Sequence, residues 1–410
     1  MSTRSLAAGQ VPGTVQGIML LLPVTLSVMG IVILIPVLPQ MMGHFSSVPN
    51  FRYLIEGGVL TMPALCVMLF SPLAGWLADL FGRRRILMIS MVVYALLGVA
   101  PAFLDNLYAI IVTRVGVGLC ESIILTVSTT LISDYFKGAA RERWLASQTA
   151  VASLSALALI YIGGLLGAAY GWRGPFGIYL YSLLLVVGLW LFTWEPPSEA
   201  GGRATGESSA GVSGFPWKRL TGICAITLFA SVLFYTVQTQ SSLVLSALGV
   251  QDPARLGLLT AIASLGVPLG TLLFRPLVRV PVGLLLLLEF ALLGASFGWM
   301  GKAPDSNTFV LAAGVNQIGC GMILPTLLTW ATRGLPFEVR GRGNGAWQGT
   351  FAVGQFLSGV VVTFLADHVG GLQPAFVVLG VCTLLAAALA LAGHLKHRST
   401  LRATSRPAAS

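Results

Sequence analysis

The chain carries very little charge. Of its 410 residues only 9% are charged and 56% are hydrophobic, and the mean hydropathy is +0.86. A water-soluble domain covers its core with charged and polar residues, which this composition cannot supply. The composition therefore excludes a soluble globular protein and predicts an integral membrane protein.

Residues that carry catalysis or bind metals are also scarce. The four histidines are scattered, and the five cysteines are widely separated within apolar runs, where they behave as small apolar residues. No pairing of a nucleophile with a base, no phosphate-binding glycine loop and no cluster with metal-ligand spacing is present. We therefore expect no enzyme activity, no cofactor, no metal and no disulfide.

The apolar runs do not alternate with polar residues, as the strands of a membrane barrel would. Each run is about 20 residues or longer, which is enough for a helix to cross a bilayer. The sequence thus predicts an all-α membrane protein of twelve spans, at 17–39, 55–79, 85–104, 107–134, 144–170, 174–194, 217–247, 254–275, 281–300, 308–332, 345–367 and 372–393. The first run is too long for the apolar region of a cleaved signal peptide, so we expect it to remain as the first helix.

The basic residues predict the orientation. Lysine and arginine are retained on the cytoplasmic side of short loops. With a cytoplasmic N-terminus, 19 of the 24 basic residues fall in cytoplasmic segments and 4 in outer loops, which leaves Arg114 inside the fourth span. Both termini are then cytoplasmic. This topology accounts for the net charge of +10, so a nucleic-acid partner is not needed.

The spans fall into two sets of six. The segment 195–216 is rich in Gly, Ser, Glu and Pro, which is typical of a flexible linker. It separates a six-helix bundle at 1–194 from a second at 217–394, which a basic tail at 395–410 follows. At an offset of 201 the halves echo each other, because Gly118 matches Gly319, Phe136 matches Phe337 and Arg141 matches Arg342.

A charged motif lies between the second and third spans, at residues 75–87, GWLADLFGRRRIL. It resembles the signature G-x-L-A-D-x-x-G-R-R-x-x-L of the major facilitator superfamily of transporters. The matching residues are Gly75, Asp79, Gly82, Arg83 and Arg84. The resemblance implies two pseudo-symmetric six-helix bundles built as parallel repeats, and a conformational latch at this loop.

Asp79 is the centre of that expected latch. It lies at the cytoplasmic edge, where we expect its carboxylate to accept from the N-terminus of span eleven near Asn344 and to pair with nearby arginines. Such a latch would hold the outward-facing state. Its loss would change the conformational equilibrium more than substrate recognition.

Span one ends at Gly30 to Pro39 with paired prolines, and span five ends in Gly-Trp-Arg, which resembles the drug, tetracycline and siderophore efflux branch of the family. Two positions depart from that pattern. Ser27 stands where tetracycline-type exporters carry an acidic residue, and Leu159-Ile160 replaces the Gly-Pro of the antiporter signature. The second departure leaves uptake by proton symport open.

Charged side chains inside a bilayer are costly, about 2.5 to 3.5 kcal/mol each by translocon scales, so each is a functional candidate. Three are identified: Arg114, Glu121 and Glu289. Arg114 and Glu121 lie on one face of span four, about 10.5 Å apart at roughly 1.5 Å per residue. Arg114 occupies the place of the family's fourth-helix signature, which implies proton coupling. Glu121 is the predicted proton carrier, because removal from water disfavours the ionised carboxylate. For Glu289 we prefer a structural or interfacial role.

The substrate cavity is expected among polar and aromatic side chains on the inward faces of several spans. Some of these groups will bond neighbouring helices rather than a ligand. Many amides and hydroxyls with few fixed charges suit a moderately polar organic molecule. The predicted lining residues are Tyr235, Gln238, Thr239, Ser242, Asn316, Gln317, Gln348, Gln355, Gln148 and Tyr161.

The sequence favours a proton-coupled exporter of a drug-like molecule or a secreted metabolite such as a siderophore, acting by alternating access. Uptake by proton symport is the first alternative, and a non-transporting membrane receptor or assembly protein is the second. We expect a monomer in a bacterial-type inner membrane whose partners are the bilayer, protons and a small-molecule substrate.

Overall fold

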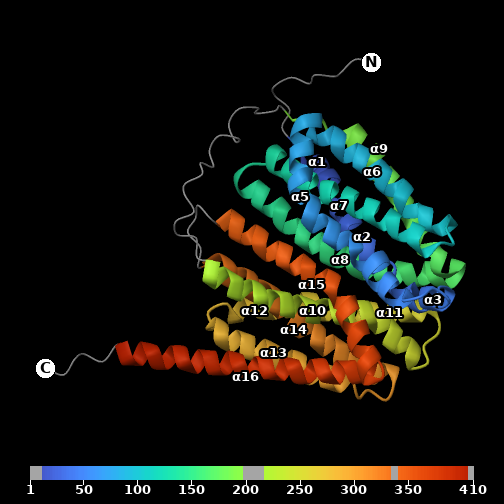
Figure 1. Cartoon of the computed structure of the whole chain (residues 1–410). Helices are drawn as coiled ribbons and strands as arrows, with labels where there is room; N and C mark the ends of the chain where they lie inside the picture. The colour runs from blue at the N-terminus through green and yellow to red at the C-terminus, as the bar shows by residue number, and fades with distance from the viewer. Residues whose placement is uncertain (1–11, 197–216, 334–339, 405–410) are drawn as a thin grey trace. The chain divides into compact units, whose positions relative to one another are not determined.

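The computed structural model describes residues 12–196, 217–333 and 340–404, which contain helices and turns and no strand. The chain divides into two compact units, Met1–Pro216 and Trp217–Ser410, drawn blue to green and yellow to red in Figure 1. Each unit supplies its own buried core.

The first unit holds six passes built from helical pieces. These are α1 (Thr14–Leu21), α2 (Val24–Val32), α3 (Leu38–His44), α4 (Phe51–Tyr53), α5 (Met62–Phe81), α6 (Arg83–Val99), α7 (Leu107–Tyr135), α8 (Gly138–Tyr170) and α9 (Tyr181–Phe192). A π-helix, Leu54–Thr61, precedes α5, and 3-10 helices lie at Ile35–Val37, Ala100–Phe103 and Gly171–Leu180.

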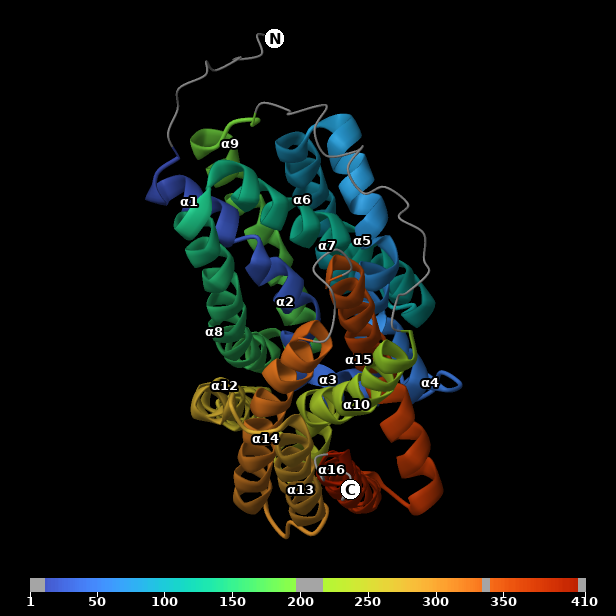
Figure 2. The ribbon, with the colours of Figure 1, turned by 90° about the vertical axis from the view of Figure 1, so that its left-hand side faces the viewer.

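The second unit is more regular. Its helices are α10 (Trp217–Ala247), α11 (Pro253–Ser264), α12 (Gly266–Leu277), α13 (Val282–Met300), α14 (Ser306–Arg333), α15 (Arg340–Val369) and α16 (Leu372–Thr404). Within this unit α13 packs along both α14 and α16, as Figure 2 also shows. Helix α16 continues through part of the segment that the sequence assigns to the basic tail.

Twelve passes agree with the expected topology. Eleven helical segments are long and apolar enough to cross a membrane, and one of them, Gly138–Phe192, is 55 residues long. That segment contains both α8 and α9, separated at Gly171, whose φ of 68° ends α8. A left-handed backbone of this kind is readily adopted only by glycine. The long segment is therefore two passes.

Several passes are broken, and proline explains where. Proline lacks an N–H, and its ring clashes with the carbonyl four residues earlier. Helix α2 ends at Val32, four residues before Pro36, and α11 ends at Ser264, four residues before Pro268. The broken part of span one packs against Gly163 of α8, where any Cβ would overlap the Ile33 carbonyl.

The third and fourth passes of the second unit are joined by a short turn with a clear helix start. The Asp305 carboxylate accepts the N–H groups of Asn307 at 2.9 Å and Thr308 at 3.0 Å, and the Thr308 hydroxyl at 2.7 Å. The bonds from Thr308 and Asn307 lower the pKa of Asp305. An ionised carboxylate thus caps the N-terminus of α14.

Candidate functional site

Arg114 lies wholly inside the first unit, with 0% of its surface exposed. Its guanidinium donates to three oxygens from three other segments. Nε donates to the Val59 carbonyl at 2.9 Å, one Nη donates to the Tyr179 hydroxyl at 2.7 Å, and the other donates to the Gly30 carbonyl. The buried charge is therefore held by polar groups rather than by a carboxylate.

The two carbonyls are available because their helices are irregular. In an α-helix the Val59 carbonyl would accept the N–H of residue 63, but that residue is proline and has none. The Gly30 carbonyl would accept from Leu34, whose N–H instead donates to Ile31 O at 3.2 Å. Neither carbonyl thus has its α-helical donor, and Arg114 donates to both.

Glu121 lies two turns further along α7 and is also buried, with 2% of its surface exposed. Its Oε1 lies 3.4 Å from the Tyr94 hydroxyl, which itself donates to the Leu26 carbonyl at 2.7 Å. Because a tyrosine hydroxyl has a single hydrogen, the closer carbonyl takes it. A protonated Glu121 completes this arrangement by donating to the Tyr94 oxygen.

Arg114 and Glu121 both contact Gly30. Arg114 binds the Gly30 carbonyl, and a Cβ built on Gly30 would overlap the Glu121 carboxyl. No basic nitrogen lies within 4.0 Å of Glu121 in the described part of the chain. The residues that bond or contact one another around Gly30 form the Gly30 cluster. Its members are Leu26, Gly30, Val59, Tyr94, Arg114, Glu121 and Tyr179.

The second unit holds a third buried charged group from the sequence analysis, Glu289 on α13, at 0% exposure. The Thr326 hydroxyl on α14 lies 2.6 Å from its Oε1. Sequence reasoning missed a fourth such group: Glu56 is also at 0% exposure, in the π-helix Leu54–Thr61. The signal was present, since residue 56 falls inside the second apolar run.

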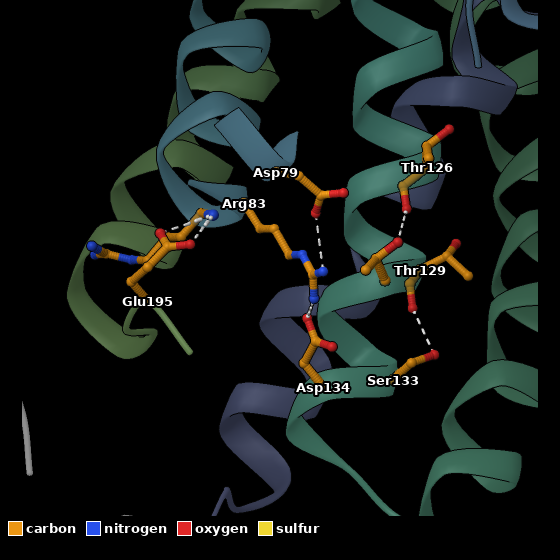
Figure 3. Close-up of polar contacts among 9 residues, drawn as sticks. Asp79, Arg83, Thr126, Thr129, Ser133, Asp134 and Glu195 are labelled. Atoms are coloured by element: carbon orange, nitrogen blue, oxygen red, sulfur yellow. Dashed lines mark hydrogen bonds and ion pairs between the residues drawn. The ribbon is translucent and has the colours of Figure 1, made fainter. Parts of the chain in front are cut away.

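Figure 3 shows the charged loop at the other end of the first unit. Gly82, with φ of 87°, turns the chain between α5 and α6, and Arg83 follows it. Arg83 donates to Asp79 at 3.1 Å and also pairs with Asp134 on α7. The Asp79 side chain is 68% exposed and that of Asp134 is 13% exposed. A Cβ on Gly75 would meet nothing within 4 Å, and the side chain of Asn344 lies outside those described.

Arg84 points away from that pair and fixes the end of α9. Its backbone N–H donates to the Glu195 carboxylate at 3.0 Å, and its side chain donates to the Thr193 hydroxyl at 3.1 Å and the Trp190 carbonyl at 2.8 Å. Glu195 thus satisfies the N-terminus of α6. In the sequence, Glu195 falls in the expected linker and Asp134 ends the fourth apolar run, so neither stands out as a candidate.

The predicted cavity residues of α10 and α14 divide by how well they are bonded. Asn316 is buried and donates to Ser296 at 3.0 Å, so it ties α14 to α13. Thr239 donates to the carbonyl of Tyr235 at 3.0 Å on its own helix. Gln238 and Gln317 share one long hydrogen bond of 3.4 Å.

The remaining predicted lining residues are more varied. The Ser242 hydroxyl is buried and has no hydrogen-bond partner in the described structure. Tyr235 packs its ring against Phe351, at 5.5 Å between centroids. Gln148 shares a hydrogen bond with Thr129 on α7. Tyr161 and Gln348 are exposed, and Gln355 is partly exposed, as are Gln148 and Tyr235.

These features define a polytopic helical membrane protein of two six-helix units with a buried arginine–carboxyl cluster in one of them. The sequence model of the Major Facilitator Superfamily matches residues 20–357 and, a second time, residues 228–408. The chain belongs to that family.

Curated relatives match a part of the chain. One is the niacin transporter NiaP of Acinetobacter baylyi, 27% identical over 135 residues, which are 32% of this chain and 31% of that protein. Another is the multidrug resistance protein Stp of Mycobacterium tuberculosis, 31% identical over 134 residues, 32% of this chain and 25% of that protein. The chain therefore aligns with less than a third of either relative.

Solved structures match nearly the whole fold. A bacterial homologue of the human lysosomal transporter Spinster has a TM-score of 0.78 at 18% identity, covering 93% of this chain and 97% of that one. A D-xylose–proton symporter has a TM-score of 0.76 at 15% identity, covering 92% and 97%. At these identities the likeness shows the fold alone.

Proposed function

We propose that this protein is a secondary transporter that exports a small organic solute across a bacterial inner membrane in exchange for protons. The observation that carries the proposal is Glu121, a buried carboxyl that lies against Gly30 and has a hydroxyl rather than a cation as its hydrogen-bonding neighbour. The names of two curated relatives, a niacin transporter and a multidrug resistance protein, support a small organic solute, and the second supports export.

Glu121 carries the proton. When protonated, it donates to the Tyr94 oxygen, whose own hydrogen is committed to the Leu26 carbonyl. Burial opposes ionisation, while the fixed charge of Arg114 two turns away favours it. Water or a cationic solute that reaches the carboxyl adds to the second effect. Entry of water or of a cationic solute then releases the proton.

Arg114 holds the first span, which contains Gly30, against α7. A guanidinium stays charged, and this one is fixed by carbonyls at the breaks of spans one and two and by the Tyr179 hydroxyl. Gly30 belongs to span one and contacts both Arg114 and Glu121. An ionised Glu121 changes the contacts of Gly30, so proton loss changes the position of the broken first span relative to α7.

The solute binds among amides and hydroxyls of α10 and α14, such as Gln238 and Gln317, whose 3.4 Å hydrogen bond is readily exchanged for one to a ligand. A drug-like molecule or a siderophore has the matching groups. The two units rock around this site, both termini face the cytoplasm, and the Asp79–Arg83–Asp134 triad latches the cytoplasmic end.

The test is accumulation of labelled lipophilic cations, antibiotics and iron chelators in cells that express the native protein or Glu121→Gln, with and without an uncoupler. Lower accumulation with the native protein, abolished by uncoupler and by Glu121→Gln, is the expected result. Higher accumulation would replace export by proton symport. Absence of any flux or counterflow across the panel would favour a receptor or assembly protein.

A further inference from the structure

Glu289 is the buried acidic side chain of the second unit that the proposed mechanism does not use. It follows five consecutive leucines on α13 and is 0% exposed. Its one hydrogen-bonding neighbour in the described structure is the Thr326 hydroxyl on α14, at 2.6 Å from Oε1, and Oε2 has no partner. The side chain is therefore held at one oxygen and lacks a counterion.

Two arrangements of hydrogens fit the Thr326 contacts, and burial decides between them. An ionised Glu289 would accept the Thr326 hydrogen at 2.6 Å but would leave a charge buried without a counterion. The Thr326 hydroxyl also lies 3.1 Å from the Met322 carbonyl on its own helix. A carbonyl can only accept, and a threonine hydroxyl has one hydrogen. If Glu289 is protonated, it donates to Thr326, and Thr326 donates to Met322. Every hydrogen then has an acceptor, and no bare charge is buried.

The first unit has a similar chain of bonds from a carboxyl to a hydroxyl to a carbonyl, but there the carboxyl and the hydroxyl lie on the opposite passes. In the first unit the carboxyl, Glu121, is on the fourth pass and the hydroxyl, Tyr94, is on the third. In the second unit the carboxyl is on the third pass, α13, and the hydroxyl is on the fourth, α14. At the repeat offset of 201, Thr326 corresponds to Leu125, one turn from Glu121, and Glu289 corresponds to Met88, six residues from Tyr94.

No cation competes for the Glu289 carboxyl. In the described part of the chain no basic nitrogen lies within 4.0 Å of it. His394 on α16 packs instead against Gly283, about 9 Å along α13 at 1.5 Å per residue. Among the side chains that the structure describes, the titratable groups on the helices that contact α13 are Cys320 on α14, Cys382, His394 and Lys396 on α16, and Cys224 and Tyr235 on α10.

We propose that Glu289 is a second proton-binding site, protonated in this structure as the donor to Thr326 and ionised when a donor reaches its free oxygen Oε2. Proton binding at Glu289 stands apart from the proposed transport function. Its use as a second coupling step in the cycle rests on that function.

The experiment measures the protonated carboxyl directly, by its C=O stretch in the infrared, on the purified full chain in lipid across a pH series. Native protein is expected to show a carboxyl band that disappears reversibly as the pH rises. Glu289→Gln, which keeps a donor to Thr326, should lack that band, whereas replacing the exposed Glu142 by Gln should leave it unchanged. Thr326→Val should shift the band to higher frequency, and Thr326→Ser should restore it.

Two results would overturn the proposal: a native spectrum with no band that Glu289→Gln removes, or a Glu289 band that persists unchanged until the protein unfolds. The first would mean an ionised Glu289 and the second a permanent structural bond. Neither depends on transport. A failure of the proposed function would appear instead in the accumulation assay of the native protein.

Discussion

Arg114 and Glu121 are joined through one glycine: the guanidinium binds the Gly30 carbonyl, and the carboxyl lies where a side chain on Gly30 would be. The proposed proton carrier and the fixed charge therefore contact the same point of the first pass. The α-helix of that pass ends at Val32, a few residues after Gly30 and before Pro36. A change at Glu121 can therefore be taken up by a change of angle at this break.

Gly30→Ala is expected to abolish proton-driven transport. Its Cβ would overlap the Glu121 carboxyl, and overpacking of a tight site costs about 1 to 3 kcal/mol. Gly43→Ala is the matched control, since its Cβ would meet nothing within 4 Å on the same pass. Flux and thermal unfolding would be measured for both. Equal flux in the two variants would contradict the role of Gly30.

Arg114→Lys is expected to destabilise the protein strongly. A lysine ammonium cannot reach three acceptors arranged around a planar guanidinium, and each buried acceptor left unsatisfied costs about 1 to 3 kcal/mol. Arg173→Lys is the control, because Arg173 pairs with an exposed Asp105 and such pairs contribute about 0 to 1 kcal/mol. Thermal unfolding in detergent would compare them, and a similar melting temperature for both would refute the account.

The sequence predicted the number of passes and the three buried charged groups because both can be read from the apolar runs. It predicted the charged loop because that motif is contiguous in the sequence. It did not predict what Arg114 binds. Pro63 denies the Val59 carbonyl its α-helical donor, and the donor that bonds it instead lies 55 residues away in the sequence. Such partners depend on packing between distant passes.

Other features were missed for different reasons. Glu56 lies near the end of its run and was not counted, although its burial is complete. Asp134 and Glu195 were missed because their partners, Arg83 and Arg84, are distant in the sequence and meet them only in the folded chain. Asp79 pairs with Arg83, one of the nearby arginines expected as partners, while its expected contact near Asn344 lies outside the described side chains.

Asp134→Asn is expected to slow turnover more than Asp79→Asn. Both accept from Arg83, but Asp134 is the more buried, with 13% of its side chain exposed against 68% for Asp79. Water therefore screens the Arg83–Asp134 pair less than the Arg83–Asp79 pair. Turnover at saturating solute would be compared with solute affinity. A larger effect of Asp79→Asn on turnover would contradict the importance of Asp134.

Gln238→Ala and Asn316→Ala should affect different quantities. The weakly bonded Gln238 is expected to contribute to solute affinity, so its loss should raise KM with little change in melting temperature. Asn316 ties α14 to α13 through Ser296. Its loss should lower the melting temperature, because a hydrogen bond between membrane helices contributes about 0.6 to 1.7 kcal/mol to stability. The opposite pattern would show that Asn316 binds the solute.

The central claim is that Glu121 carries the coupling proton, and proteoliposomes test it most directly. The solute would be the first compound of the panel that the native protein moves. Glu121→Gln is expected to lose transport driven by an imposed pH gradient while keeping exchange of labelled for unlabelled solute, because exchange needs no net proton movement. Gradient-driven transport that survives in Glu121→Gln, at the native number of protons per solute, would contradict the account.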